Sequence, residues 1–265
     1  MSYWSGTMEI YFLFGILGVI TGFLSGLLGI GGGIVMAPLL IYVPPVFGIQ
    51  PLAMQSIAGL TVVQGLAACL TGSLTHKKMH FVSGELSLYM GSAIFIAAGI
   101  GGIGSNFLSN THLLFIFACL AFTAACLMIV PVAKDSELPD VTTIKFNRYR
   151  ALTTASGVGL CGGLVGQGGS FILIPLMTSY VQIPTRIAIG SNLAIVLLSS
   201  LAAFLGKALT GQIQWLLTIP ILLTVIPAAY WGGLMSRRVS VRALRQLLAI
   251  LIGLAAVRIW ITVLL

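Results

Sequence analysis

Residues 26–39 read GLLGIGGGIVMAPL, and residues 163–176 read GLVGQGGSFILIPL. A shift of 137 positions matches four glycines, two leucines and a proline between the two stretches. Weaker matches pair Ala53 and Ser56 with Ala188 and Ser191, and Gly101, Gly102 and Ser105 with Gly232, Gly233 and Ser236. Such self-similarity predicts a duplicated chain with halves at residues 1–131 and 151–265, joined by a polar linker at residues 132–150.

The composition around these stretches excludes a soluble protein. Of the 265 residues, 58% are hydrophobic and only 7% are charged, whereas soluble domains carry about 25% charged residues. Soluble enzymes, nucleic-acid binders and disordered proteins are therefore excluded, and the lipid bilayer is the expected partner. The four cysteines lie in apolar runs without CxxC spacing, so they are expected to be small hydrophobic residues. No metal or cofactor is expected.

Eight apolar runs predict the membrane helices, since a spanning helix needs about 20 apolar residues. They are Ile10–Val43, Leu52–Thr75, Ser83–Phe107, Leu113–Val130, Ala151–Ile183, Ile187–Thr210, Ile213–Met235 and Ala243–Leu265. The first and fifth are too long for one crossing, and a glycine cluster interrupts each of them. We therefore predict an all-α polytopic membrane protein with two inverted repeats. Each repeat comprises a re-entrant-like helix hairpin with a glycine turn and three spanning helices.

The basic residues predict how this arrangement lies in the membrane. If each hairpin returns to the face that it left, one face receives eleven Lys and Arg residues, and the other receives only Lys207 with Arg258 nearby. If each hairpin crossed the membrane once, the two faces would receive seven and five Lys and Arg residues. The positive-inside rule favours the first arrangement. Both termini are then expected outside and the linker inside.

The glycine turns are the candidate functional site. Residues 151–166 give about 24 Å of helix, short of the ~30 Å hydrocarbon core, so the turns are expected inside the membrane. Helices starting at Gly31 and Gly168 would direct unpaired N–H groups and positive dipole ends inward, which suits an anion. The alternative is that glycines serve close helix packing, and we favour that function for Gly18, Gly22 and Gly26.

Polar residues near the turns are candidate ligands, because buried polar groups in membranes mark pathways. Gln167, Ser170 and Asn192 have no polar counterparts in the first half and are expected to donate to the substrate; interhelical hydrogen bonding is the alternative. Ser25 and Gln64 also lie near the turns. The predicted substrate-binding set is Gly31, Gly32, Gly33, Gln55, Ser56, Gln167, Gly168, Gly169, Ser170, Ser191 and Asn192.

Three residues outside the turns are candidates for a gate or mouth. Arg186 follows Pro184 at the inner end of its helix, where it could collect anions or simply anchor the helix at the inner face. Pro220 and Pro227 lie within one predicted helix and would produce either a flexible gating element or a static kink.

The double G-x-G-G-x(5)-P turn resembles the TauE/SafE sulfite exporter (TSUP) family. The copies are Gly29 to Pro38 and Gly166 to Pro175, and the segments Met54-Gln55-Ser56 and Ile189-Gly190-Ser191-Asn192 follow them. The resemblance covers nearly the whole chain and implies a bacterial inner-membrane permease for sulfite, sulfonates such as sulfoacetate, or related sulfur oxyanions. The first copy has Gln55-Ser56 where a Gly-Thr-Ser-like run is more usual, which predicts an asymmetric substrate shell.

The titratable residues bear on energy coupling and on rival functions. No Asp or Glu lies deep in an apolar run, and His76 is expected at a loop, so we predict uncoupled or weakly coupled anion export and no intramembrane enzyme. A proton-coupled transporter of another small anion and a non-transporting accessory membrane protein remain alternatives. The sequence leaves the oligomeric state open.

Overall fold

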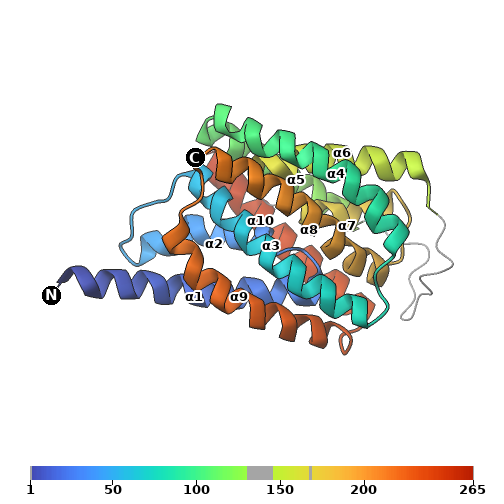
Figure 1. Cartoon of the computed structure of the whole chain (residues 1–265), viewed down its shortest axis with the longest axis horizontal. Helices are drawn as coiled ribbons and strands as arrows, with labels where there is room; N and C mark the ends of the chain where they lie inside the picture. The colour runs from blue at the N-terminus through green and yellow to red at the C-terminus, as the bar shows by residue number, and fades with distance from the viewer. Residues whose placement is uncertain (1, 130–145, 167–168, 265) are drawn as a thin grey trace.

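The computed structural model describes residues 2–129, 146–166 and 169–264. These residues form ten α-helices and one short 3-10 helix, with no strand among them (Figure 1). In chain order the elements are α1 (Ser2–Leu28), α2 (Gly33–Val46), α3 (Met54–Lys78), α4 (Gly84–Gly104), η1 (Ser105–Phe107), α5 (Asn110–Ile129), α6 (Arg148–Val165), α7 (Ser170–Ser179), α8 (Thr185–Leu209), α9 (Trp215–Ser236) and α10 (Val241–Leu264).

The predicted all-α polytopic membrane fold is confirmed. Within the described residues, six helices are long and apolar enough to cross a membrane, namely α1, α3, α4 with η1, α5, α8 and α9. By contrast, α2 has only 14 residues and α7 only 10. These two helices extend about 21 Å and about 15 Å at 1.5 Å per residue, so neither spans a bilayer.

The two long apolar runs each divide at their glycines, as predicted. Gly29, Gly31 and Gly32 have φ angles of 71°, 63° and 78°, while Gly166 and Gly169 have 83° and 70°. This left-handed conformation cannot continue a right-handed helix and favours glycine, which has no Cβ. The helices after the turns start at Gly33 and Ser170, two residues later than predicted.

Each hairpin returns to the end of the molecule from which it started. Ile10 and Phe12 in the first half of α1 line the same cavity as Phe47 and Gly48, which follow α2. In the second hairpin, Nη1 of Arg150 in the first turn of α6 donates to the carbonyl oxygen of Tyr180 after α7, at 3.3 Å. The two hairpins open toward opposite ends of the molecule (Figure 1).

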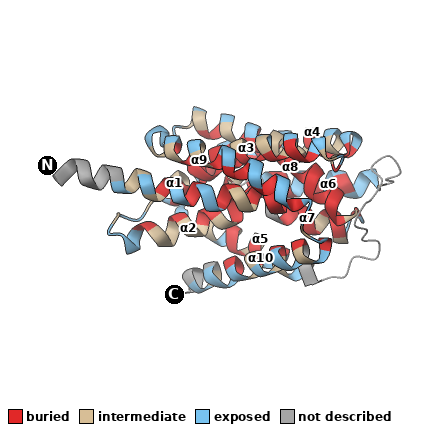
Figure 2. Cartoon of the chain, turned by 90° about the horizontal axis from the view of Figure 1, so that it is seen from below, coloured by how far each residue is buried: buried red, intermediate tan, exposed pale blue. Residues whose placement is uncertain are grey.

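The first half packs into the second through reciprocal helix pairs. Helix α1 lies along α9, and α6 lies along α4. Helix α3 packs against α8 in the buried middle, and α5 packs against α10 (Figure 2). Exchanging α1–α5 with α6–α10 leaves this set of pairs unchanged, which is the pattern expected of two equivalent halves.

Glycines allow the closest of these helix contacts. A Cβ added to Gly26 of α1 would lie 2.8 Å from the backbone nitrogen of Gly233 of α9. A Cβ added to Gly163 of α6 would lie 2.9 Å from Cα of Ala98 of α4. Gly18 and Gly22 face α9 in the same way, so the prediction that the Gly18–Gly22–Gly26 ridge serves helix packing is confirmed.

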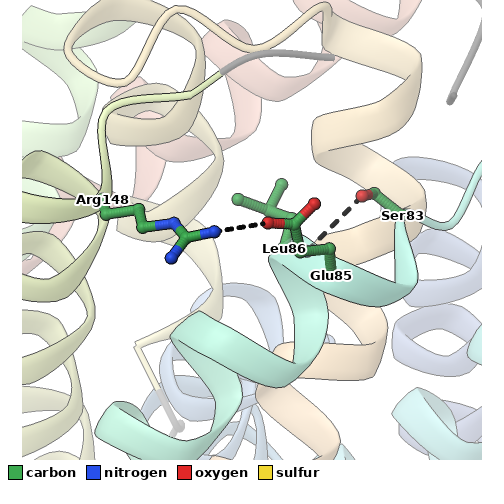
Figure 3. A network of polar contacts seen from close by, with 4 residues as sticks. All are labelled: Ser83, Glu85, Leu86 and Arg148. Carbon is green, nitrogen blue, oxygen red and sulfur yellow. Dashed lines mark hydrogen bonds and ion pairs between the residues drawn. The ribbon is translucent and has the colours of Figure 1, made fainter. Parts of the chain in front are cut away.

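The two ends of the bundle differ in charge. One end, called here the basic end, holds the last turns of α3 and α9 and the first turns of α4, α6 and α8. Arg148 of α6 forms an exposed ion pair there with Glu85 of α4 (Nη2–Oε1 3.2 Å), beside Ser83, which caps α4 (Figure 3). The other described basic residues at this end are Lys77, Lys78, Arg150, Arg186, Arg237, Arg238 and Arg242. The last turn of α8, which carries Lys207, and the C-terminal part of α10, which carries Arg258, lie toward the opposite end, with both termini (Figure 1).

Candidate functional site: the paired glycine turns

The two glycine turns contact each other in the middle of the molecule. Ser170, the first residue of α7, donates a hydrogen bond from Oγ to the carbonyl oxygen of Ile30 in the first turn. Nδ2 of Asn192 in α8 donates to the carbonyl oxygens of Gly29 at 2.5 Å and Ser170 at 3.1 Å. Ile30, Ser170 and Asn192 are each 0% exposed. The starts of α2 and α7 therefore meet within the protein.

The helix starts supply hydrogen-bond donors and partial positive charge. The first intrahelical bonds run from Val35 and Met36 to the carbonyl of Gly32, and from Ile172 and Leu173 to that of Gly169. The N–H groups before these residues have no acceptor within their own helices. Neither first turn contains an acidic residue. Because each helix start carries roughly half a positive charge, an anion between them would stabilise both.

Gln64 of α3 adds an uncompensated polar group to this site. Its amide lies against the backbone at Gly32, immediately before α2. The side chain is 0% exposed, and neither Nε2 nor Oε1 has a hydrogen-bond partner among the described residues. Leaving a buried polar group unsatisfied costs about 1–3 kcal/mol. This orphaned amide therefore points to a ligand between the turns.

Two further buried oxygens near the turns also lack partners among the described residues, Oγ of Ser25 and Oδ1 of Asn192. Thr61 of α3 donates to the carbonyl oxygen of Gly166 at 3.3 Å. A Cβ on Gly65 would lie 3.4 Å from the carbonyl oxygen of Gly31 and 3.6 Å from Oγ of Ser200. Thus α3 and α8 enclose the turns from the two halves of the chain.

The structure brings some predicted residues together and places others elsewhere. Gly31, Gly32, Gly33, Gly169, Ser170 and Asn192 form the buried turn region. Gln167 and Gly168 lie outside the described residues. Ser170 and Asn192, which we expected to donate to a substrate, direct donors to backbone carbonyls of the turns instead. In this arrangement their interactions match the alternative, interhelical bonding.

Three predicted residues make contacts away from the turns. Gln55 donates to the carbonyl oxygen of Leu108 at 3.3 Å, and Ser56 accepts from Nε2 of Gln214 at 3.0 Å. Gln55 is nine residues before Gln64 on α3, so about 13 Å of helix separates them. Oγ of Ser191 accepts from the backbone N–H of Ser83 at 2.9 Å, and thereby joins α8 to the segment before α4.

The predicted mouth and gate residues have definite positions. Arg186 is 7% exposed at the basic end. It donates to the carbonyl oxygens of Ser236 at 3.2 Å and Val239 at 3.0 Å. These contacts hold the start of α8 against the end of α9. Helix α9 continues through both Pro220 and Pro227.

One sequence-based placement is wrong, and a second basic residue is buried. His76, expected at a loop, is 2% exposed in the last turn of α3, with Nε2 3.0 Å from the carbonyl oxygen of Gly26. Lys207, which the charge count assigns to the outer face, is 0% exposed in the last turn of α8. Both are buried because residues from other elements cover the last turns of α3 and α8.

An all-α membrane bundle in which two short helices begin face to face at its centre has the architecture of a membrane transporter. Transporter substrate sites are characteristically formed by interrupted helices whose starts point at the substrate.

Comparison with known proteins identifies the transporter family to which this chain belongs. The model of the family described as "Sulfite exporter TauE/SafE" matches residues 14–259, and the chain belongs to this family. It is 24% identical over 237 residues to a probable membrane transporter protein, YunE, of Bacillus subtilis, covering 82% of this chain and 84% of that protein. It is 25% identical over 248 residues to the probable membrane transporter protein MJ0441 of Methanocaldococcus jannaschii, covering 90% and 91%. No solved structure matches significantly.

Proposed function

We propose that this protein is a permease that exports a sulfur-containing anion, either sulfite or an organosulfonate such as sulfoacetate. The observation that carries the proposal is the meeting of two helix starts beside the buried, unpartnered amide of Gln64. The family description, "Sulfite exporter TauE/SafE", supports sulfur oxyanions as the substrate class. We propose transport rather than catalysis as the activity.

The chemistry of the turns suits an anion that must be released again. Sulfite and sulfonate groups present three oxygens that accept hydrogen bonds from N–H groups. Among the described residues, those in contact at the turns carry no formal positive charge, so the site offers dipoles and amide donors. Transport requires binding that is favourable yet weak enough for release. Neutral donors meet this requirement better than a salt bridge.

The described site is closed to both sides, because Ile30, Gln64, Ser170 and Asn192 are fully buried. Loading and release therefore require the surrounding helices to separate, first at one end and then at the other, as in alternating access. Separation of α3 from α8 would break contacts between the halves while leaving each hairpin intact.

The membrane potential is the proposed driving force. Moving one negative charge outward across an inside-negative potential of about 100 mV releases about 2.3 kcal/mol, roughly a forty-fold concentration ratio. Proton coupling is the second candidate, and the buried position of His76 favours it more than the sequence did, because intramembrane titratable groups form proton relays.

Flux through the purified chain in liposomes tests the function and distinguishes the two driving forces. We expect sulfite efflux to follow an imposed potassium-diffusion potential and to be insensitive to a pH gradient. At 100 mV, the sulfite concentration ratio across the membrane is expected to reach about forty-fold. Absence of sulfite and sulfoacetate flux from correctly folded protein would refute the proposal. Flux that followed only the pH gradient would replace uncoupled export with proton coupling.

We also propose that the two halves are inverted repeats in the bacterial cytoplasmic membrane, with both termini outside and the basic end in the cytoplasm. The clustering of described basic residues at the end opposite both termini supports this orientation (Figure 1) under the positive-inside rule.

Reporter fusions to the C-terminus measure this orientation in cells. Alkaline phosphatase, which folds only outside the cytoplasm, is expected to be active when fused after Leu265, whereas a green fluorescent protein fusion is expected to be dark. The opposite pair of signals would invert the proposed topology.

A further inference from the structure

Lys207 is a buried cation with only neutral hydrogen-bond partners. Its Nζ donates to Oγ of Ser105 at 2.8 Å and to Oε1 of Gln212 at 3.2 Å, and the side chain is 0% exposed. Ser105 begins η1 after α4, and Gln212 lies between α8 and α9. An ammonium group has three donors, so these two hydrogen bonds leave capacity for one more acceptor.

No described carboxylate neutralises this charge. Glu85 is paired with Arg148 at the basic end, and the structure records no ion pair between Lys207 and any described residue. The three remaining acids besides Glu9 belong to the linker at residues 132–150. Burying an unpaired charge in a membrane protein is costly. A mobile anion would supply the missing negative charge.

Lys207 lies on the same helix as a residue that borders the turns. Ser200 of α8 is close to Gly65 and to the turn at Gly31. Lys207 follows it by seven residues, which places both on the same helix face with about 10 Å between them along the axis. Just beyond Lys207, Leu209 is 83% exposed. Lys207 therefore lies between the turns and the end of the bundle opposite the basic end.

A comparable buried basic residue occurs in the first half of the chain. The shift of 131 residues that pairs Ser105 with Ser236 also pairs His76 with Lys207. Nε2 of His76 lies 3.5 Å from Oγ of Ser236, as Lys207 contacts Ser105. Each buried basic side chain thus bridges the two halves at its own end of the bundle.

We propose that Lys207, with Ser105 and Gln212, forms a second anion-binding position between the turns and the outer face. An oxyanion at this position accepts a hydrogen bond from Nζ of Lys207. It replaces Oγ of Ser105, Oε1 of Gln212 or both as the acceptor. This loosens the contact between the end of α8 and η1. The identity of the anion as a sulfur oxyanion rests on the proposed function, whereas anion binding by the buried ammonium does not depend on transport.

The test measures sulfite-dependent thermal stabilisation of the purified full chain in detergent at constant ionic strength. The Gln64→Leu variant is the background, because it weakens binding at the turns. On this background, Lys207→Met is expected to raise the sulfite concentration for half-maximal stabilisation by at least about tenfold, as for loss of one charge-assisted hydrogen bond. Lys207→Arg, which keeps the charge, is expected to retain binding. Lys78→Met, which removes an exposed lysine at the basic end, is the matched control.

A Lys207→Met protein that binds sulfite as its parent does would overturn the proposal. If this variant does not fold, Lys207→Gln, which keeps a hydrogen-bonding side chain but removes the charge, is measured on the same background. It is expected to weaken sulfite binding as Lys207→Met does, and binding equal to that of its parent would overturn the proposal.

The two proposals fail in distinguishable ways. If Lys207→Met weakens the stabilisation by sulfite but the unaltered protein shows no liposome flux, the second site stands and the transport function fails. If flux is present and Lys207→Met changes neither flux nor binding, transport stands and the second site fails.

Discussion

Replacement of Gly169 by alanine is expected to reduce sulfite flux at least about tenfold, the effect of losing one good hydrogen bond to the anion. Gly169 has a φ of 70°, and an added Cβ would lie 2.7 Å from the carbonyl oxygen of Val158. A non-glycine residue in this conformation costs about 1–2 kcal/mol before any clash. Relief of the clash with α6 shifts the start of α7 relative to Ile30 and Asn192, so the two helix starts no longer converge on one anion.

Gly48→Ala is the matched control for this substitution. Gly48 has a similar φ of 74°, but nothing lies within 4 Å of its added Cβ, so the variant shares the backbone strain without the displacement. Initial flux per unit of folded protein in liposomes is compared, with folding checked by size-exclusion chromatography and circular dichroism. Equal flux from folded Gly169→Ala and unaltered protein would show that α7 does not position the substrate.

Replacement of Gln64 by leucine is expected to remove transport while stabilising the protein. The substitution removes a fully buried amide with no partner among the described residues and keeps a side chain of similar volume. Removal of an unsatisfied polar group is expected to increase the free energy of unfolding by about 1–3 kcal/mol. Loss of its donor at the start of α2 is expected to lower flux at least about tenfold.

Flux assays and thermal unfolding of the same preparation measure both effects. Gln214→Leu serves as the control, since Gln214 is exposed near the start of α9 and bonds to Ser56. It is expected to change neither flux nor stability appreciably. A Gln64→Leu protein with normal flux would exclude Gln64 from the site, and a destabilised protein would show that its amide has a structural partner.

The two glycine turns could be predicted from sequence because their signal is local. Glycine clusters interrupt apolar runs that are otherwise too long for one crossing, and left-handed φ angles at Gly29, Gly31, Gly32, Gly166 and Gly169 explain why glycine is required. The packing function of Gly18, Gly22 and Gly26 follows from their spacing on one helix face. Neither inference depends on knowing which helices become neighbours.

The choice among polar residues depended on those neighbours. Gln55 and Gln64 are both glutamines of α3, and the position of the segment Met54-Gln55-Ser56 after the first turn favoured Gln55. The start of α2 meets α3 at Gln64 instead, a crossing that no local pattern specifies. Likewise, the donors on Ser170 and Asn192 can bind a substrate or a backbone carbonyl equally well. Which acceptor they bind depends on the contact between the turns, which the sequence does not specify.

The burial of His76 and Lys207 was missed for a related reason. Polar residues near the end of an apolar run suggest a surface position, but residues of the opposite half cover both side chains. In both cases the covering residue includes a serine from the other half, Ser236 or Ser105. The end of one helix and its cover lie more than 100 positions apart in the chain.

The central claim is that an oxyanion binds where α2 and α7 begin. A crystal structure of the purified chain with selenite, a sulfite analogue whose selenium gives an anomalous signal, measures this directly. The account predicts an anomalous peak between Nε2 of Gln64 and the first N–H groups of α2 and α7, placed so that the selenite oxygens accept hydrogen bonds from these donors. A peak found only at Lys207 or Arg186, with the turns empty in protein whose sulfite flux selenite inhibits, would contradict it.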